Sequence, residues 1–178
     1  AVNRTIVNLD IDRDMDAPYS VAALRDRAAL TAQSLSDGPN ALYQPTFFSE
    51  DGGIAWVGRA DFLVPTDVAS LLGNYSFEPE DTKLARIAKV NAVLQLCSYA
   101  EQLTKLQGTE PEFIHVVTGS AKEGKVTIRL SEVSAYFRHV KKNLQQAVID
   151  KFEGPSEPVP VENCNMCRWN KDCAQWWR

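Results

Sequence analysis

Two aspartates and one lysine form the pattern in this chain that could perform chemistry. Asp61 lies in the stretch Gly-Arg-Ala-Asp-Phe-Leu, and Asp81 is separated from Lys83 by one residue. Two carboxylates that come close together repel each other unless a cation lies between them, and oxygen ligands favour Mg²⁺ or Mn²⁺. A lysine beside such a metal can orient or deprotonate a water and stabilise charge on a phosphate. The three side chains together would suit metal-assisted hydrolysis of a phosphodiester bond.

Two predicted strands have to bring these side chains together. Residues 54–64 have the composition of a single strand, in which alternation places Asp61 on the same face as Arg59 and Leu63. Residues 75–83 begin as a second strand, and a spacing of two puts Asp81 and Lys83 on one side of it. The two aspartates converge if these strands pair. The alternative is a solvated strand end with a surface ion pair of little energetic value.

A long helix is expected directly after the second strand. Residues 84–106 contain no Gly or Pro and carry a broad apolar face at helical spacing. Gln95 and Tyr99 stand four residues apart, so they project from one side of this helix. From spacing alone, they are a polar stripe at the edge of a buried helix.

These stretches resemble the RecB-like branch of the PD-(D/E)XK nuclease superfamily. The similarity is carried by three motifs: Gly-Arg-Ala-Asp-Phe-Leu at 58–63, Asp-Thr-Lys-Leu-Ala-Arg at 81–86 and Gln-Leu-Cys-Ser-Tyr at 95–99. Their order and spacing match the family over roughly residues 40–178. The resemblance implies an α/β fold with a restriction-endonuclease-like core, in which helices flank a central mixed sheet.

The resemblance also implies roles for the matched residues. Asp61 and Asp81 would bind the divalent metal, the carbonyl group of Thr82 would be a further ligand, and Lys83 would be the catalytic lysine. The family's Gln-x-x-x-Tyr motif lies beside the site and contacts the nucleic acid backbone. In this chain that motif is matched by Gln95 and Tyr99.

Three further polar residues are weighed against this pattern. Gln44 falls where family members often have the same residue, although a polar side chain at a strand edge is an equally good interpretation. Pro79 and Glu80 stand where the family usually has apolar residues. Since Pro cannot donate to a ladder, we expect an edge strand or a bulge there, and a bulge would make Glu80 a reserve metal ligand. His115 is interpreted as a packing residue within an apolar strand.

The remaining elements complete an alternating helix and strand pattern. Ser20 is expected to cap a helix, and Ser131 another. The predicted strands cover residues 5–11, 41–49, 111–118 and 125–130, and the predicted helices cover residues 21–34 and 131–152.

Three cysteines follow a segment rich in Pro and Glu. Cys164, Cys167 and Cys173 lie within ten residues, and thiolates grouped in this way suit zinc or an iron–sulfur cluster. Both usually need four ligands. Cys97, the remaining cysteine, is interpreted as a small apolar residue of the buried helix. The sequence therefore predicts a core over residues 1–153 and a cysteine-rich tail over residues 154–178.

The spacing of these cysteines after such a core resembles the iron–sulfur nucleases of the AddB and CRISPR-associated types. That resemblance implies a structural 4Fe-4S cluster whose fourth cysteine lies N-terminal to the core, before Ala1. We expect the chain to be a piece of a longer polypeptide, without the family's N-terminal helix and the metal ligand that this helix often supplies.

Composition restricts the class of protein. A chain of 178 residues is long enough for one domain with a real core, and a net charge of −4 argues against nonspecific coating of nucleic acid. Since no apolar run approaches a membrane span and no secretory signal opens the chain, we expect a cytoplasmic protein without a membrane partner.

Three functions fit these observations. The first is a Mg²⁺- or Mn²⁺-dependent DNA nuclease, acting on single strands or duplex ends within a larger DNA repair protein and working with a fused or associated helicase. The second is an inactive nuclease-fold module that binds nucleic acid or serves as a scaffold. The third is a zinc-tailed protein-interaction domain in which the Asp-x-Lys pattern is chance.

Overall fold

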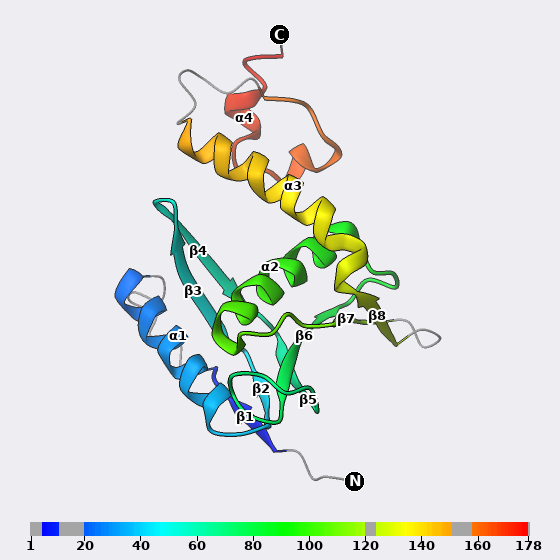
Figure 1. The fold of residues 1–178 in the computed structure, drawn as a ribbon. Coiled ribbons are helices and arrows are strands. Elements are labelled where there is room, and N and C mark those ends of the chain that lie inside the picture. Colours follow the sequence, from blue (N-terminus) through cyan, green and yellow to red (C-terminus); the bar gives the residue numbers. More distant parts are fainter. Residues whose placement is uncertain (1–4, 11–19, 120–123, 151–157, 178) are drawn as a thin grey trace. The chain divides into compact units, whose positions relative to one another are not determined.

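The computed structural model describes residues 5–10, 20–119, 124–150 and 158–177 of an α/β chain (Figure 1). Two compact units are distinguished, Ala1–Lys141 and Lys142–Arg178, and each is described by itself. The boundary expected between residues 153 and 154 lies outside the described residues.

The first unit is built on a six-stranded mixed sheet. Its strands lie in the order β1-β2-β5-β6-β7-β8, where β1–β2 and β6–β7 are parallel pairs and the other neighbours are antiparallel. The predicted central mixed sheet is therefore confirmed. The bounds of the strands are β1 Ile6–Asn8, β2 Ala41–Tyr43, β5 Phe62–Thr66, β6 Ser76–Lys83, β7 Phe113–Thr118 and β8 Lys125–Arg129.

A separate hairpin of two strands, β3 (Thr46–Asp51) and β4 (Ile54–Arg59), carries the chain between the halves of this sheet. The prediction of one strand over residues 54–64 is wrong, because the chain leaves the hairpin at Ala60 and Asp61 and enters the main sheet at β5. Residues 41–49 break in the same way, at Gln44, whose φ is 56°. The two breaks are hydrogen-bonded to each other, from Gln44 N to Asp61 O (2.8 Å) and from Ala60 N to Pro45 O (3.2 Å).

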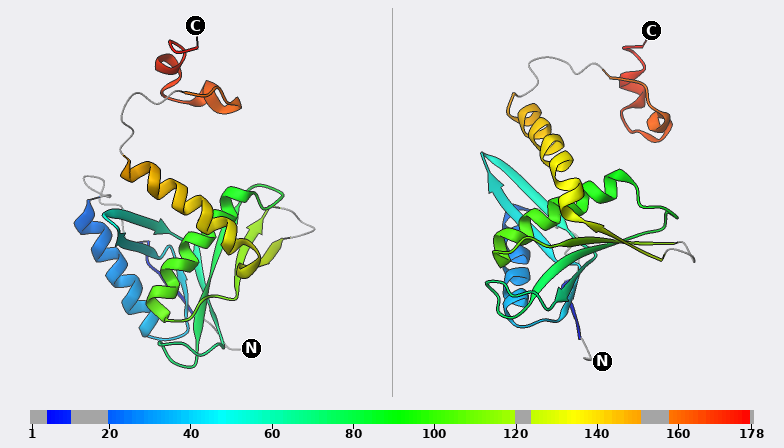
Figure 2. Two further views of the ribbon diagram at one scale, coloured as in Figure 1. Left: turned by 45° about the horizontal axis from the view of Figure 1, so that its top comes forward. Right: turned by 45° about the vertical axis from the view of Figure 1, so that its right-hand side comes forward.

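Three long helices accompany these strands. Helix α1 (Val21–Ser36) packs on β3, and Ser20 caps it as predicted, since Ser20 Oγ accepts a hydrogen bond from Ala23 N. Helix α2 (Val90–Gln107) packs against β6 and β7 on one side and contacts the hairpin (Figure 2). Helix α3 (Leu130–Ile149) follows β8 without a loop, so the helix begins before Ser131, the predicted cap.

The predicted helix start at Leu84 is wrong, since α2 begins at Val90. Residues 84–89 are held in a non-helical path by a hydrogen bond from Gly119 N to Ala85 O (3.2 Å). A Cβ atom at position 119 would lie 2.9 Å from the carbonyl oxygen of Leu84, so only glycine allows this close approach. Leu84 is consequently fully exposed rather than part of a buried face.

Strand β6 lies inside the sheet, so the edge or bulge predicted at Pro79 is also wrong. The pairing with β5 continues without interruption from Val64–Glu78 through Leu63–Pro79 to Phe62–Glu80. An antiparallel ladder uses the N–H groups of alternate residues, and the pairing with β7 begins only at Glu80. Proline is therefore compatible with this inner position.

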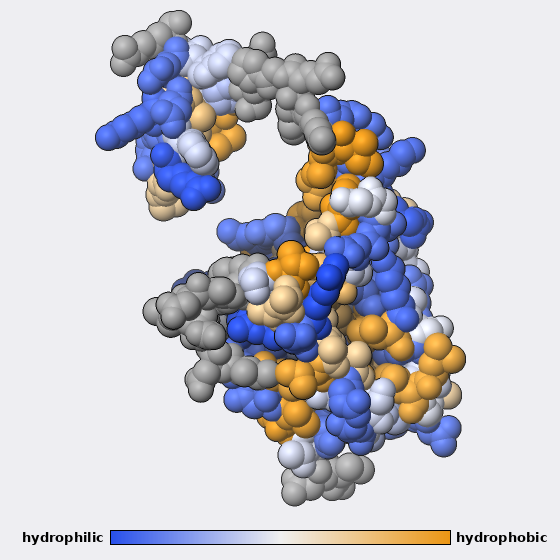
Figure 3. Space-filling model, turned by 90° about the vertical axis from the view of Figure 1, so that its left-hand side faces the viewer, coloured by the Kyte–Doolittle hydropathy of each residue, from blue (hydrophilic) through white to orange (hydrophobic). Residues whose placement is uncertain are grey.

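The core of the first unit lies between α2 and the sheet. Apolar side chains from both fill it together with Leu35 of α1, and the removal of this apolar surface from water stabilises the unit. Its fully buried members include Leu35, Leu42, Leu63, Phe77, Leu96, Ala100, Leu103, Ile114 and Val116. Other apolar side chains stay at the surface, where they lie among hydrophilic ones (Figure 3). In the described part of the chain, no helix has the length and apolar character needed to cross a membrane.

The second unit contains the end of α3, a short 3-10 helix (η1, Glu162–Met166) and a single helical turn (α4, Asn170–Cys173). Two side chains hold this segment together. Asn170 Nδ2 donates to Cys164 O (2.7 Å), and Trp177 Nε1 donates to Pro158 O (2.6 Å).

Candidate metal centre

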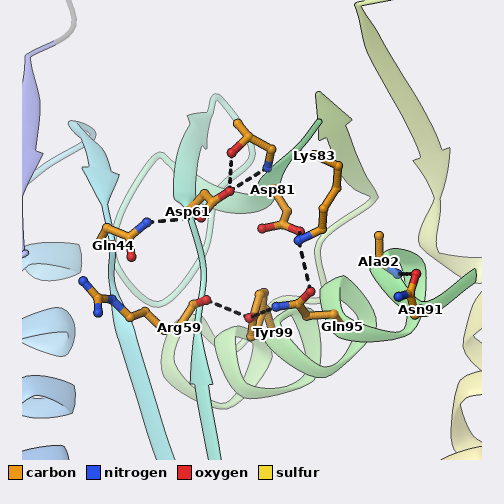
Figure 4. Close-up of polar contacts among 10 residues, drawn as sticks. Gln44, Arg59, Asp61, Asp81, Lys83, Asn91, Ala92, Gln95 and Tyr99 are labelled. Carbon is orange, nitrogen blue, oxygen red and sulfur yellow. Dashed lines mark hydrogen bonds and ion pairs between the residues drawn. The ribbon is translucent and has the colours of Figure 1, made fainter. Parts of the chain in front are cut away.

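Asp61 occupies the link between the two sheets, where its carboxylate accepts hydrogen bonds from two sides (Figure 4). Gln44 Nε2 donates to Oδ1 (3.1 Å). The backbone N–H of Thr82 donates to Oδ2 (2.7 Å), and the Thr82 hydroxyl donates to the same oxygen. The break in the chain thus leaves Asp61 beside the end of β6, where these groups fix its orientation.

Asp81 lies on β6 with only 2% of its surface exposed. Its carboxyl group is within hydrogen-bonding reach of Asp61 and forms an ion pair with Lys83. The Lys83 ammonium is the ion-pair partner of Oδ2, and a carboxylate has about four lone-pair sites in all. Asp81 therefore retains capacity to accept a further ligand.

A chain of polar contacts connects Lys83 to α2. Lys83 Nζ donates to Gln95 Oε1 (3.3 Å), Gln95 Nε2 donates to the Tyr99 hydroxyl (2.5 Å), and that hydroxyl donates to Arg59 O (2.7 Å) (Figure 4). The Tyr99 ring lies against Gly58, where a Cβ atom would come within 2.7 Å of it. The missing side chain at position 58 therefore makes room for Tyr99.

The two carboxyl groups have pKa values that move in opposite directions. Burial raises the pKa of Asp81 and the neighbouring Asp61 raises it further, against the opposing charge of Lys83. Burial also acts on Asp61, but its hydrogen bonds with Thr82, Asp81 and Gln44 together outweigh burial and lower its pKa. Burial raises the pKa of the Tyr99 hydroxyl. With the two pKa values separated in this way, the first proton that the pair takes up as pH falls goes to Asp81.

The donor set fits a divalent cation. Two carboxylates meet there, and a dication between them would offset the repulsion that contributes to the raised pKa of Asp81. Mg²⁺ is commonly held by one or two carboxylates while it keeps several waters. In the described ranges, however, no three His, Cys, Asp or Glu side chains gather into a ligand set. Any ion would need further oxygen ligands from backbone or water.

The structure thus brings together all six residues that the sequence assigned to the site. They are Asp61, Asp81, Thr82, Lys83, Gln95 and Tyr99. The sequence did not predict that the hydroxyl and the backbone N–H of Thr82 both donate hydrogen bonds to Asp61. No spacing rule reveals this contact, because it depends on the break at Ala60.

Glu80 does not belong to this site, so its prediction as a reserve ligand is wrong. Without a bulge in β6, Glu80 points away from Asp81 and forms an ion pair with Lys125 on β8 (2.7 Å). His115 is a satisfied packing residue, as predicted. It is 7% exposed and contacts Glu78 Oε2 (2.8 Å) and Thr127 Oγ1 (3.1 Å).

The cysteines divide between the two units. Cys97 is buried in α2, where burial raises the pKa of its thiol to about 11, in agreement with its interpretation as an apolar residue. Cys164, Cys167 and Cys173 are free thiols in the second unit, and Cys164 Sγ accepts a hydrogen bond from Val161 N (3.2 Å). These three thiols are not gathered into a ligand set among the described residues.

No family model matches the chain, and no curated protein matches it either.

Proposed function

We propose that the first unit is a metal-dependent DNA nuclease with a restriction-endonuclease-like core, related to the RecB-like group. The observation that supports this proposal is the meeting of Asp61, Asp81 and Lys83, in which two carboxylates lie together and that of Asp81 is buried. A carboxylate pair with an adjacent ammonium provides the functional groups that metal-assisted phosphodiester hydrolysis needs.

Each residue has a task in this proposal. Asp61 and Asp81 would hold Mg²⁺ or Mn²⁺ with the Thr82 carbonyl, and the bound ion would supply an activated water and charge stabilisation. Lys83 donates hydrogen bonds to the water or to a phosphate oxygen. Gln95 keeps the ammonium in place, because its Oε1 accepts from Lys83 Nζ, and Tyr99 holds Gln95 in turn.

The test compares two lysines from opposite faces of the sheet. Lys83→Ala removes the ammonium beside Asp81, whereas Lys125→Ala removes an equal charge that is paired with Glu80. We expect Lys83→Ala to lower the rate of Mn²⁺-dependent cleavage of labelled single-stranded and duplex DNA about a hundredfold or more. Lys125→Ala should cleave normally. Equal cleavage by both variants, with unchanged circular dichroism, would exclude the assignment.

A second candidate function is an inactive module that binds DNA through a nuclease fold. It is favoured by the small number of ligands, since the described residues provide two carboxylates and the ammonium is already paired with one of them. Fluorescence anisotropy with labelled DNA separates the two functions. A module of this kind binds equally in EDTA and in Mn²⁺ and never cleaves, whereas the nuclease cleaves when Mn²⁺ is added.

For the second unit, we propose that Cys164, Cys167 and Cys173 are ligands of a structural 4Fe-4S cluster, with zinc as the alternative. The support is their spacing and their position in one compact unit. Because three thiols are too few, a fourth ligand has to come from another segment. Iron, sulfide and zinc analysis of anaerobically purified protein tests this. Zinc without iron would instead favour a zinc-tailed interaction domain.

The cellular setting is part of the same proposal. A nuclease unit of this kind would take DNA as its partner in the cytoplasm, in cooperation with a fused or associated helicase. Copurification of a helicase with the tagged full-length protein, sensitive neither to DNase nor to EDTA, is the expected result.

A further inference from the structure

Buried polar atoms without hydrogen-bond partners gather where the β3–β4 hairpin packs against α2. Four such side-chain atoms occur among the described residues, and three of them are Ser49 Oγ, Trp56 Nε1 and Gln102 Nε2. The fourth belongs to Asp81 in the candidate metal centre, where the Lys83 ammonium lies beside it. A buried donor without a partner destabilises a fold, so Ser49 and Gln102, which lie together there, require an explanation.

Ser49 and Gln102 face the same junction, and Trp56 lies beside Ser49 on the hairpin. Ser49 and Trp56 are direct cross-strand partners, so they project from one face of the hairpin. Phe47 is on that face, two residues before Ser49, and its ring stacks on Tyr99 of α2 with 5.9 Å between ring centroids. Gln102 follows Tyr99 by three residues and therefore projects from the same side of α2.

A cavity of about 150 Å³ lies at this junction. Ser49 and Gln102 both line it, and Gln102 is only 5% exposed. Its other walls are largely apolar, with contributions from Ala28, Phe48 and Leu106, and Lys105 adds one cation. A cavity of this volume accommodates a molecule about the size of benzene.

The polar atoms of the cavity determine which ligand would fit. Gln102 Nε2 can only donate a hydrogen bond, the Ser49 hydroxyl is able to donate, and Lys105 carries a positive charge. No acidic side chain is among the described residues that line the cavity. The missing partner is therefore an acceptor, preferably an anionic one, attached to an apolar body that fits between Phe48 and Leu106.

We propose that this cavity is a binding site for a small carboxylic acid with a flat apolar body, of about the size of benzoate. The carboxylate accepts hydrogen bonds from Gln102 and Ser49 and lies near the charge of Lys105, and the ring packs against Phe48 and Leu106. The cavity shares no lining residue with the candidate metal centre. The proposal is therefore independent of nuclease activity.

Titration calorimetry on the whole chain with benzoate and with its neutral isostere benzamide tests the proposal. We expect saturable binding of benzoate, and benzamide should bind about tenfold more weakly because charge-assisted hydrogen bonds are the stronger ones. Gln102→Leu and Lys105→Gln should each weaken benzoate binding to a similar extent. Lys105 is exposed, so Lys105→Gln folds even if the buried substitution does not.

The matched control is Arg138→Gln, which makes the same charge change at an exposed position on α3. Arg138 lines a neighbouring cavity of about 230 Å³ that also includes Lys105, but it does not line this one. Binding of benzoate should be unchanged in Arg138→Gln. The proposal is overturned if benzoate does not saturate, if both cavity variants bind normally, if Arg138→Gln loses binding, or if a crystal soaked in benzoate retains only ordered waters there.

Discussion

The two faces of β6 carry acid–base pairs that differ in how completely they are satisfied. On one face Asp81 forms an ion pair with Lys83 and lies next to Asp61. On the other, Glu78 Oε1 accepts from Phe113 N (3.1 Å) and Glu78 Oε2 contacts His115 (2.8 Å). Both acids are buried, with 2% of Asp81 and 9% of Glu78 exposed.

This difference shows that burial of a carboxylate does not by itself identify a functional site. Glu78 has a partner for each oxygen, which is how a buried carboxylate stabilises a fold. Asp81 has the like charge of Asp61 beside it as well as the Lys83 ammonium, and the repulsion between the two carboxylates costs stability unless a bound cation offsets it. The incomplete pair, rather than the more complete one, is therefore the candidate for function.

The largest effect should come from Asp81→Asn in metal binding. This substitution keeps the shape of the side chain but removes the charge that a dication requires, so the affinity for Mn²⁺ should fall about a hundredfold or more. Titration calorimetry measures the change. Glu80→Gln, one residue away on the opposite face, is the control and should bind Mn²⁺ normally. Loss of affinity in both variants would remove the distinction between the faces.

The next largest effect should be a difference in the free energy of unfolding between Glu78→Ala and Asp81→Asn, measured in EDTA. Glu78→Ala leaves the partly buried Phe113 N–H and His115 Nε2 without their partner, so the free energy of unfolding should fall by about 2–3 kcal/mol. Asp81→Asn removes an incompletely satisfied charge and should change it by less than about 1 kcal/mol. Urea unfolding measures both values. A larger loss in Asp81→Asn than in Glu78→Ala would reverse the comparison.

The smallest effect concerns pH. Because the pKa of Asp81 is raised, Asp81 takes up a proton at a higher pH than an ordinary aspartate, and a bound dication has to displace that proton. Below the pKa of Asp81, the affinity for Mn²⁺ should fall about tenfold per pH unit. Calorimetry over a pH series tests this, and an affinity independent of pH through the acid range would contradict it.

In EDTA, the two aspartates should affect stability with opposite signs. The raised pKa of Asp81 favours the folded state below the ordinary aspartate pKa of 3.8, and this contribution disappears as pH rises through the raised pKa. The lowered pKa of Asp61 contributes stability above 3.8, which is lost as pH falls through the lowered value. Unfolding of Asp61→Asn and Asp81→Asn over pH would separate the two contributions.

Local patterns predicted much of the fold and most of the candidate site. Ser20 caps α1 because its hydroxyl reaches the N–H of Ala23, a contact within four residues. Spacing by two places Asp81 and Lys83 on one side of β6, and spacing by four places Gln95 and Tyr99 on one side of α2. Each of these predictions depends only on the geometry of a single element.

Other features escaped prediction because they depend on contacts between distant segments. Residues 54–64 have a continuous strand composition, yet the chain breaks at Ala60 and Asp61, where Pro45 O and Gln44 N hold it. Leu84 belongs to an apolar helical pattern, yet Gly119 keeps its segment out of α2. Pro79 suggested an edge, whereas β6 has a neighbour on both sides.

By itself, the sequence determined which residue types stand at which spacing: an aspartate and a lysine two apart, a glutamine and a tyrosine four apart, and three cysteines in a short tail. The tertiary structure alone decided that Asp61 meets Asp81, that Glu80 turns to Lys125, and that Ser49 and Gln102 share a cavity. The reason is that side-chain periodicity is a property of one strand or helix, whereas the meeting of two elements is decided by where the chain breaks and by what packs between them.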